Sequence, residues 1–181
     1  MLRVLLLFCL ISFSSEVNAN NKDQIINKLK KTSNLNFDFE QNINGKIEFG
    51  NCTIQYPKKM FCEYDKKNKV IVSNGKSLFI KTTSSYYRYP LDKTPLNFIL
   101  DKNFLLKKIS KLNEEIINNS LVKFTIKENN QSIEIFFDID NSNLIGWQTK
   151  DIYQNAAVTL LYSVESNQIV DQKIFETPLQ N

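Results

Sequence analysis

The chain has 181 residues, a formal net charge of +4 at pH 7 and no histidine. Without histidine it has no Ser-His or Cys-His catalytic dyad and lacks the commonest zinc ligand. Its four glycines do not form a phosphate-binding loop. The dispersed lysines are typical of a solvated face, with weak attraction to anionic lipid head groups as the alternative. We therefore expect a binding protein and not an enzyme, with no cofactor and no metal site.

The first nineteen residues have the three-part layout of a secretory signal. Arg3 is a sparse basic region, residues 4–13 form an apolar run, and small residues precede Ala19. This run is shorter than the roughly 20 apolar residues that a transmembrane helix needs. We expect cleavage after Ala19 and a soluble periplasmic monomer in which residues 20–181 form one domain. An exported location also argues against a nucleic-acid partner.

Period-two alternation of apolar residues predicts a series of antiparallel strands. The first begins at Leu35, and Pro57 and Gly75 mark reversals between later ones. Short turns favour pairing of strands that are neighbours in sequence. The predicted strands are 35–43, 45–56, 60–65, 70–73, 77–82, 86–89, 121–127, 133–138, 144–150, 156–163 and 169–175.

Helices are predicted in two places. Asp23 can cap a short helix that extends to Lys31, and Thr94 with Pro95 can begin one or two more in the segment TPLNFILDKNFLLKKISKL. The second segment carries more apolar side chains than a solvent-facing helix does, so it is expected to cover the sheet, either as a permanent plug or as a lid. The predicted lid residues are Leu96, Phe98, Ile99 and Leu100.

About eleven strands with grouped helices predict a mainly-β fold with some α (α+β). We expect a strongly curved antiparallel sheet, or half-closed barrel, whose helices form a lid over a hydrophobic cavity. Any one aromatic residue can equally be packed in a closed core, but the set favours the wall of a ligand cavity. The predicted cavity residues are Phe37, Phe39, Phe49, Ile54, Tyr56, Met60, Tyr64, Phe79 and Trp147.

Cys52 and Cys62 are the two cysteines that follow the signal. If the hairpin turns symmetrically about Pro57, residues whose numbers sum to 114 are opposed, and these two are. Opposed positions bring Cβ atoms to about 4.5–5.5 Å, close to what a disulfide needs. In an oxidising compartment we predict that bond. A turn one residue different would leave two buried thiols instead.

Five segments, in this order along the chain, resemble the LolA-type periplasmic carriers of outer-membrane lipoproteins. They are FDFEQ (37–41), GNCTIQYPKKMFCEY (50–64), VIVSNGKSLFI (70–80), YPLDKTPLNFIL (89–100) and LIGWQTKD (144–151). The resemblance implies a half-closed barrel with a helical lid over a hydrophobic cavity. It implies that lipoprotein acyl chains occupy the cavity, arriving from an inner-membrane ABC-type release complex and leaving to an outer-membrane acceptor.

Two positions depart from the family pattern. The family has an arginine immediately before the hairpin proline, a residue thought to hold the lid closed by hydrogen bonds, and this chain has Tyr56 there. Its hydroxyl offers one donor without charge. An aromatic residue on the following strand is replaced by Cys62. The alternative function is a periplasmic module that senses lipids or lipoproteins, because related half-barrels detect mislocalised lipoproteins and regulate a partner protein.

Overall fold

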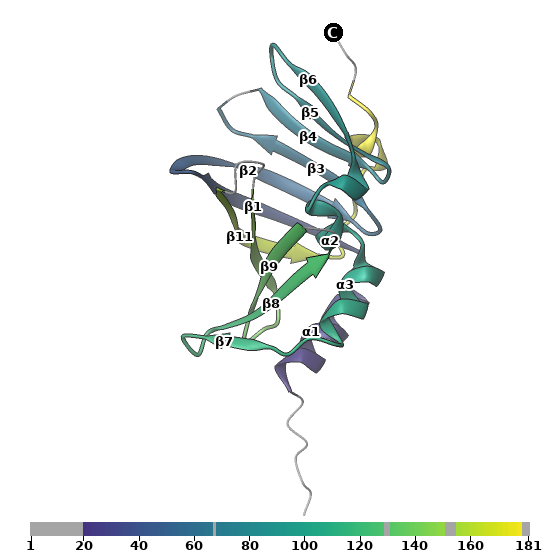
Figure 1. Cartoon of the computed structure of the whole chain (residues 1–181). Coiled ribbons are helices and arrows are strands. Elements are labelled where there is room, and N and C mark those ends of the chain that lie inside the picture. Colours follow the sequence, from purple (N-terminus) through teal and green to yellow (C-terminus); the bar gives the residue numbers. More distant parts are fainter. Residues whose placement is uncertain (1–19, 67, 129–130, 151–154, 179–181) are drawn as a thin grey trace, which may run out of the picture.

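The computed structural model describes residues 20–66, 68–128, 131–150 and 155–178, so the predicted signal lies outside the described residues. Within this part of the chain, eleven strands form one curved antiparallel sheet that does not close (Figure 1). The strand order is β6-β5-β4-β3-β2-β1-β11-β10-β9-β8-β7. Two meanders therefore meet where β1 pairs with β11, and β6 and β7 form the two edges. The predicted curved, half-closed sheet with short helices is confirmed.

The bounds of the elements follow the chain in order. The strands are β1 (Asn34–Ile43), β2 (Lys46–Gln55), β3 (Lys59–Tyr64), β4 (Lys69–Asn74), β5 (Ser77–Lys81), β6 (Tyr86–Pro90), β7 (Glu115–Ile117), β8 (Leu121–Glu128), β9 (Gln131–Asp138), β10 (Leu144–Lys150) and β11 (Ala156–Ser166). The helices are α1 (Asn21–Lys31), α2 (Leu96–Leu100) and α3 (Lys102–Ile109), with 3-10 turns η1 (Leu91–Lys93) and η2 (Gln172–Phe175).

One predicted strand is wrong and one strand was not predicted. The segment 169–175 ends in η2, whose N-cap residue Asp171 accepts a hydrogen bond from the Lys173 N–H at 3.0 Å. Such local side-chain capping competes with strand pairing. The short edge strand β7 has only three residues, too few for a period-two pattern to appear. Its pairing with β8 is supported by an ion pair of 3.0 Å between Glu115 and Lys123.

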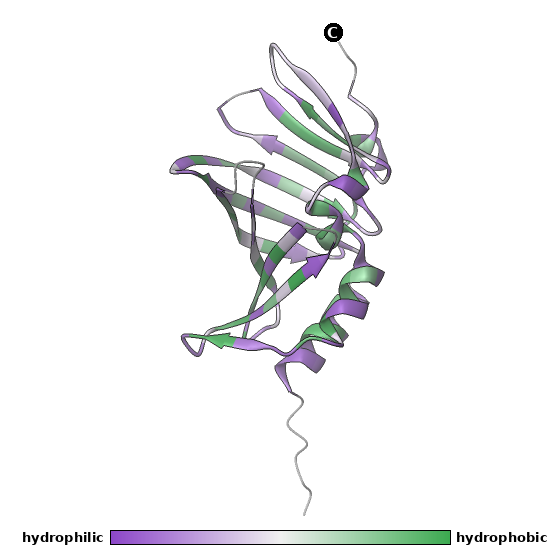
Figure 2. Cartoon of the chain, in the orientation of Figure 1, coloured by the Kyte–Doolittle hydropathy of each residue, from purple (hydrophilic) through white to green (hydrophobic). Residues whose placement is uncertain are grey.

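Strand register divides the side chains between a concave and a convex face. Figure 2 shows the resulting alternation of hydrophobic and hydrophilic bands along the strands. On the concave face, Phe37 of β1 is opposite Cys52 of β2, and Phe39 is opposite Gly50. A Cβ atom at Gly50 would lie 2.9 Å from the Phe39 ring and 2.0 Å from the carbonyl oxygen of Glu63. Only glycine therefore lets Phe39 lie against the strand at this point.

The main core lies between the concave face and the helices. α1 contributes Ile25 and Leu29, α3 contributes Leu105 and Ile109, and the far wall of the sheet is made of buried residues of β8 and β9 such as Phe124. α1 packs on α3, and α2 is followed immediately by α3. Figure 1 shows the three helices along one side of the curved sheet. The helices thus cover the apolar side of a sheet that cannot cover it by closing on itself.

A second, smaller apolar cluster lies on the convex face. Val72 of β4 is opposite Phe79 of β5, and both are buried although they do not belong to the main core. η2 contacts β3 and β4 and contributes the buried Phe175. The Lys59 ammonium lies 5.7 Å from the centre of the Phe175 ring. The segment near the C-terminus therefore covers β3 and β4 from outside.

Candidate functional site: the concave face and its helical cover

Most of the predicted cavity residues lie together on the concave face. Their side chains are buried in one continuous core beneath the helices, with Phe37 and Trp147 in edge-to-face contact at 6.2 Å between ring centres. The residues that share this face are Phe37, Phe39, Ile54, Tyr56, Met60, Tyr64 and Trp147. In this structure the helices pack directly on them, so this part of the concave face is closed.

Two predicted cavity residues lie on the other face. Phe49 is opposite Glu40 and about half exposed, on the side of β2 that does not carry Ile54. Phe79 belongs to the convex cluster under η2, whereas its neighbour Leu78 points into the main core. Because side chains alternate between faces along a strand, neither can line a cavity on the concave side. Register therefore places these two residues on the face opposite to the other seven predicted cavity residues.

The predicted lid residues form the floor of the helical cover. Phe98, Ile99 and Leu100 of α2 are buried and Leu96 is half-buried. Phe98 stacks on Phe104 of α3 with ring centres 5.3 Å apart. Burying an apolar side chain of this size stabilises by about 1.5–3 kcal/mol. The apolar contacts are therefore the main force that holds α2 on the sheet.

The turn between β2 and β3 holds the junction of α2 and α3. The backbone N–H of Lys58 donates to the carbonyl oxygen of Leu100 at 2.8 Å, and the Lys58 ammonium lies 3.0 Å from the carboxylate of Asp101. Asp101 also caps α3 by accepting from the N–H of Phe104 at 3.1 Å. The Asp101 carboxylate thus caps the N-terminus of α3 and also pairs with Lys58 of the turn.

Two lysines of α3 make further contacts beyond the helix. The ammonium of Lys102 donates to the carbonyl oxygen of Thr32, just past α1, at 2.8 Å. Lys108 pairs with Glu128 at the end of β8. Ion pairs that are this exposed contribute about 0–1 kcal/mol each. They fix the position of α3 without making its displacement expensive.

Tyr56, at the position where the resemblance implies an arginine, does not use its hydroxyl for a polar contact, although the Lys102 ammonium lies 5.6 Å from the centre of its ring. Its ring is buried, and its hydroxyl has no hydrogen-bond partner among the described residues. Burial raises the pKa of this hydroxyl well above its ordinary value, so it stays neutral. The hairpin contacts the helical cover two residues later, through Lys58.

A disulfide joins Cys52 and Cys62 across β2 and β3. The two residues are opposed in the register, as the symmetric turn about Pro57 predicts, and both are buried on the concave face. Closing a loop of this length stabilises by about 3 kcal/mol in the chain-entropy model. The bond keeps together the two strands whose turn contacts the helical cover.

A polar row borders the apolar core at the end of the strands that is far from this turn. The Tyr64 hydroxyl donates to Gln41 at 3.0 Å, and the Gln41 amide donates to the Thr159 hydroxyl at 3.1 Å. The Lys69 ammonium lies 3.5 Å from the centre of the Tyr64 ring and pairs with Glu48. Burial and the nearby Glu48 raise the pKa of Tyr64. Hydrogen bonding satisfies the Tyr64 hydroxyl, in contrast to that of Tyr56.

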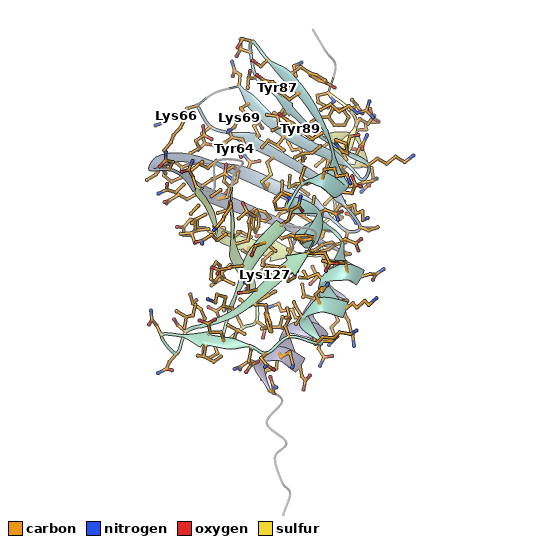
Figure 3. The ribbon with its side chains drawn as sticks, viewed as in Figure 1. Tyr64, Lys66, Lys69, Tyr87, Tyr89 and Lys127 are labelled. Atoms are coloured by element: carbon orange, nitrogen blue, oxygen red, sulfur yellow. A yellow bond between two sulfur atoms is a disulfide. The ribbon has the colours of Figure 1, made fainter. Side chains whose placement is uncertain are left out.

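The concave face continues beyond the helices onto the edge strand β6. Tyr87 is opposite Ile80, and Tyr89 is opposite the buried Leu78. The two tyrosines stack with ring centres 6.4 Å apart and remain 50% and 43% exposed. Figure 3 labels them on the upper strands, with Tyr64 and Lys69 on the strands below. The list of predicted cavity residues does not include these two tyrosines, although the Tyr-x-Tyr spacing places both rings on one face.

Comparison with known proteins decides the family. The model of the family described as "Outer membrane lipoprotein carrier protein LolA" matches residues 30–178. The chain belongs to the LolA family. None of the curated proteins matches it.

Solved structures similar to this LolA family member are distant in sequence. A LolA superfamily protein from Nitrosomonas europaea has 10% identity and a TM-score of 0.47, over 88% of this chain and 99% of that one. A putative outer membrane lipoprotein-sorting protein domain from Vibrio parahaemolyticus has 7% identity and a TM-score of 0.48, over 86% and 97%. MucB in the MucA/MucB complex of Pseudomonas aeruginosa has 8% identity and a TM-score of 0.39, over 88% and 62%.

No helix in the part of the chain that the structure describes is both long and apolar enough to span a membrane. In the same part of the chain, no three or more Cys, Asp or Glu side chains are grouped so that they could hold a metal ion.

Replacing Tyr56 by Phe should stabilise the protein by about 1 kcal/mol, because a buried hydroxyl without a partner costs folding free energy. The matched change Tyr64→Phe should destabilise by about 1 kcal/mol, because it removes the bond to Gln41. Urea unfolding at pH 7, followed by Trp147 fluorescence, measures both. Equal effects of the two substitutions would contradict the assigned hydrogen bonding.

Replacing Lys58 by Met should loosen the helical cover, because it removes the ion pair to Asp101 while the backbone hydrogen bond to Leu100 remains. We expect amide hydrogen exchange in α2 and α3 to accelerate about two- to fivefold. Lys107→Met removes the same charge from α3, where Lys107 has no ion pair among the described residues, and should leave exchange unchanged. Equal acceleration of exchange in both variants would show that loss of a positive charge, and not loss of the ion pair with Asp101, loosens the helices.

Proposed function

We propose that the chain is a periplasmic carrier that binds the acyl chains of lipoproteins on its concave face. The observation that carries this proposal is the continuity of that face: an apolar surface passes from the core under α2 to the uncovered tyrosines Tyr87 and Tyr89. A core that stayed permanently closed would not need exposed aromatic side chains beyond its helical cover. Membership of the LolA family supports the same function.

The exposed tyrosines provide the first contact for an acyl chain. The acyl chain then advances toward Leu78 and Ile71, at the main core, and displaces α2. Each buried methylene contributes about 0.8 kcal/mol. Against this, moving α2 exposes Phe98, Ile99 and Leu100, which costs about 1.5–3 kcal/mol for each side chain. The cover therefore offsets much of the binding free energy, which keeps the cargo releasable.

In this proposal the cargo is received from an inner-membrane ABC-type release complex and delivered to an outer-membrane acceptor. The α2–α3 unit acts as the lid. Its displacement breaks few polar contacts: those of Lys58 with Leu100 and Asp101, of Lys102 with Thr32 and of Lys108 with Glu128. Most of the free-energy cost of opening is thus apolar, and an acyl chain that replaces the lost apolar contacts can supply it.

The proposal is tested by incubating the purified mature protein with ATP-supplied spheroplasts. Lipoproteins should leave the membrane in a soluble one-to-one complex. Phe98→Glu should abolish release, because the closed lid would bury a carboxylate against Phe104, while far-UV circular dichroism stays unchanged. Absence of release by the wild-type protein, with a control carrier active in the same preparation, would contradict the carrier function.

The double variant Tyr87→Ser/Tyr89→Ser should bind a fluorescent long-chain acyl probe about tenfold more weakly, because the uncovered wall loses two large apolar side chains. Tyr86 lies on the opposite face of the same strand and contacts Phe79. Its replacement by Ser should lower stability and leave probe affinity nearly unchanged. Equal loss of affinity in the two variants would show that strand integrity, and not the wall, supports binding.

A further inference from the structure

The convex face has an exposed apolar surface on the opposite side of the sheet from the proposed acyl site. Ile47 and Phe49 of β2 are 50% and 49% exposed, and Leu160 and Tyr162 of β11 are 40% and 48% exposed. These residues flank β1, the central strand of the sheet. η2 contacts β3 and β4, so its contacts are with strands farther toward β6. Large apolar groups left together at the centre of a sheet face mark an interaction surface.

Register arranges this surface in three lines. Glu40 of β1 is opposite both Phe49 and Leu160. Asp38, two residues earlier on the same face, is opposite Tyr162. Apolar side chains of β2 and β11 therefore run on either side of two carboxylates of β1. We call these six residues, Asp38, Glu40, Ile47, Phe49, Leu160 and Tyr162, the convex surface.

The two carboxylates have no counter-charge of their own. Neither Asp38 nor Glu40 forms an ion pair with any residue that the structure describes, whereas Glu48, on the concave side of β2, pairs with Lys69. The chain as a whole carries a net charge of +4. Asp38 and Glu40 thus form an unpaired acidic line between two rows of apolar side chains. Such a surface favours a partner that places positive charges between two rows of apolar groups.

The spacing of the three lines fits a helix. Residues two apart on a strand are separated by about 6.7 Å, and residues four apart on a helix by about 6 Å. The two apolar lines lie two strand spacings apart, or about 9.6 Å, close to the 10–12 Å diameter of a helix. We propose that the convex surface docks an amphipathic helix of a partner protein, with Arg or Lys at positions i and i+4 between two lines of aliphatic residues.

A second copy of this chain does not supply such a helix. The apolar stripe of α1 is buried as Ile25 and Leu29, and that of α3 as Leu105 and Ile109. Of their lysines, Lys30, Lys31 and Lys107 are exposed, but the apolar stripes of the two helices are packed in the main core. The occupant is therefore a different protein, and it docks without contacting the concave face.

The test uses a fluorescein-labelled synthetic helix of 18 residues with Arg at i and i+4, flanked by Leu on both sides. Fluorescence anisotropy measures its affinity for the wild-type chain and for Asp38→Asn/Glu40→Gln. We expect affinity about tenfold lower for the double variant and falling with added salt. Asp92→Asn/Asp140→Asn removes the same charge from other surfaces and should bind as the wild type does. A peptide with Glu in place of Arg should not bind.

Peptide-induced changes in amide chemical shifts distinguish the sites. Changes in β1, β2 and β11 that disappear in Phe49→Ser support the proposal. Changes confined to α2 and β6 would place the peptide in the acyl site and overturn it, as would equal affinity for the Asp38→Asn/Glu40→Gln variant. A dimer of the unliganded protein that Phe49→Ser dissociates would also overturn it, because the surface would then be occupied by a second copy.

Discussion

Packing of α2 and α3 on the concave face is the interaction on which the rest of the structure depends. A sheet that curls without closing leaves one apolar side to be covered by other elements, and here Phe98, Ile99 and Leu100 make the closest cover. If these helices were absent, Phe37, Ile54 and their neighbours would face water. The fold is stable because the cover is apolar, and the polar contacts that also hold the cover, those of Lys58, Lys102 and Lys108, are few.

The hairpin of β2 and β3 links the sheet to this cover in a way that differs from the family pattern. Tyr56 stands at the arginine position, and its side-chain hydroxyl makes no hydrogen bond among the described residues. Lys58 instead supplies a backbone donor to Leu100 and an ammonium to Asp101. The backbone bond is independent of side-chain identity, so this contact can persist where the family's arginine is missing. The Cys52–Cys62 disulfide keeps the two strands that carry the turn in register.

Period-two patterning was enough to predict most strands and the opposition of Cys52 and Cys62, because local alternation and one proline determine both. It was not enough to assign faces to the aromatic residues. Phe49 and Phe79 entered the predicted cavity because they are aromatic, although their positions relative to Ile54 and Leu78 place them on the opposite side. Phe79 is buried on the convex face opposite Val72, and η2, which is almost a hundred positions later in the chain, contacts the neighbouring strands β3 and β4. No local pattern contains that arrangement.

The convex cluster under η2 also makes the sheet mechanically uneven. β3 and β4 are packed on the concave side by the main core and on the convex side by η2, and β3 is cross-linked to β2. β8 and β9 bury Phe124 and Phe137 on their concave side alone, within the described residues. The two halves therefore differ in stiffness. In the proposed carrier function, the interior expands against the stiffer half that carries β3 and β4, by movement of the helices and of the hairpin of β8 and β9 opposite it.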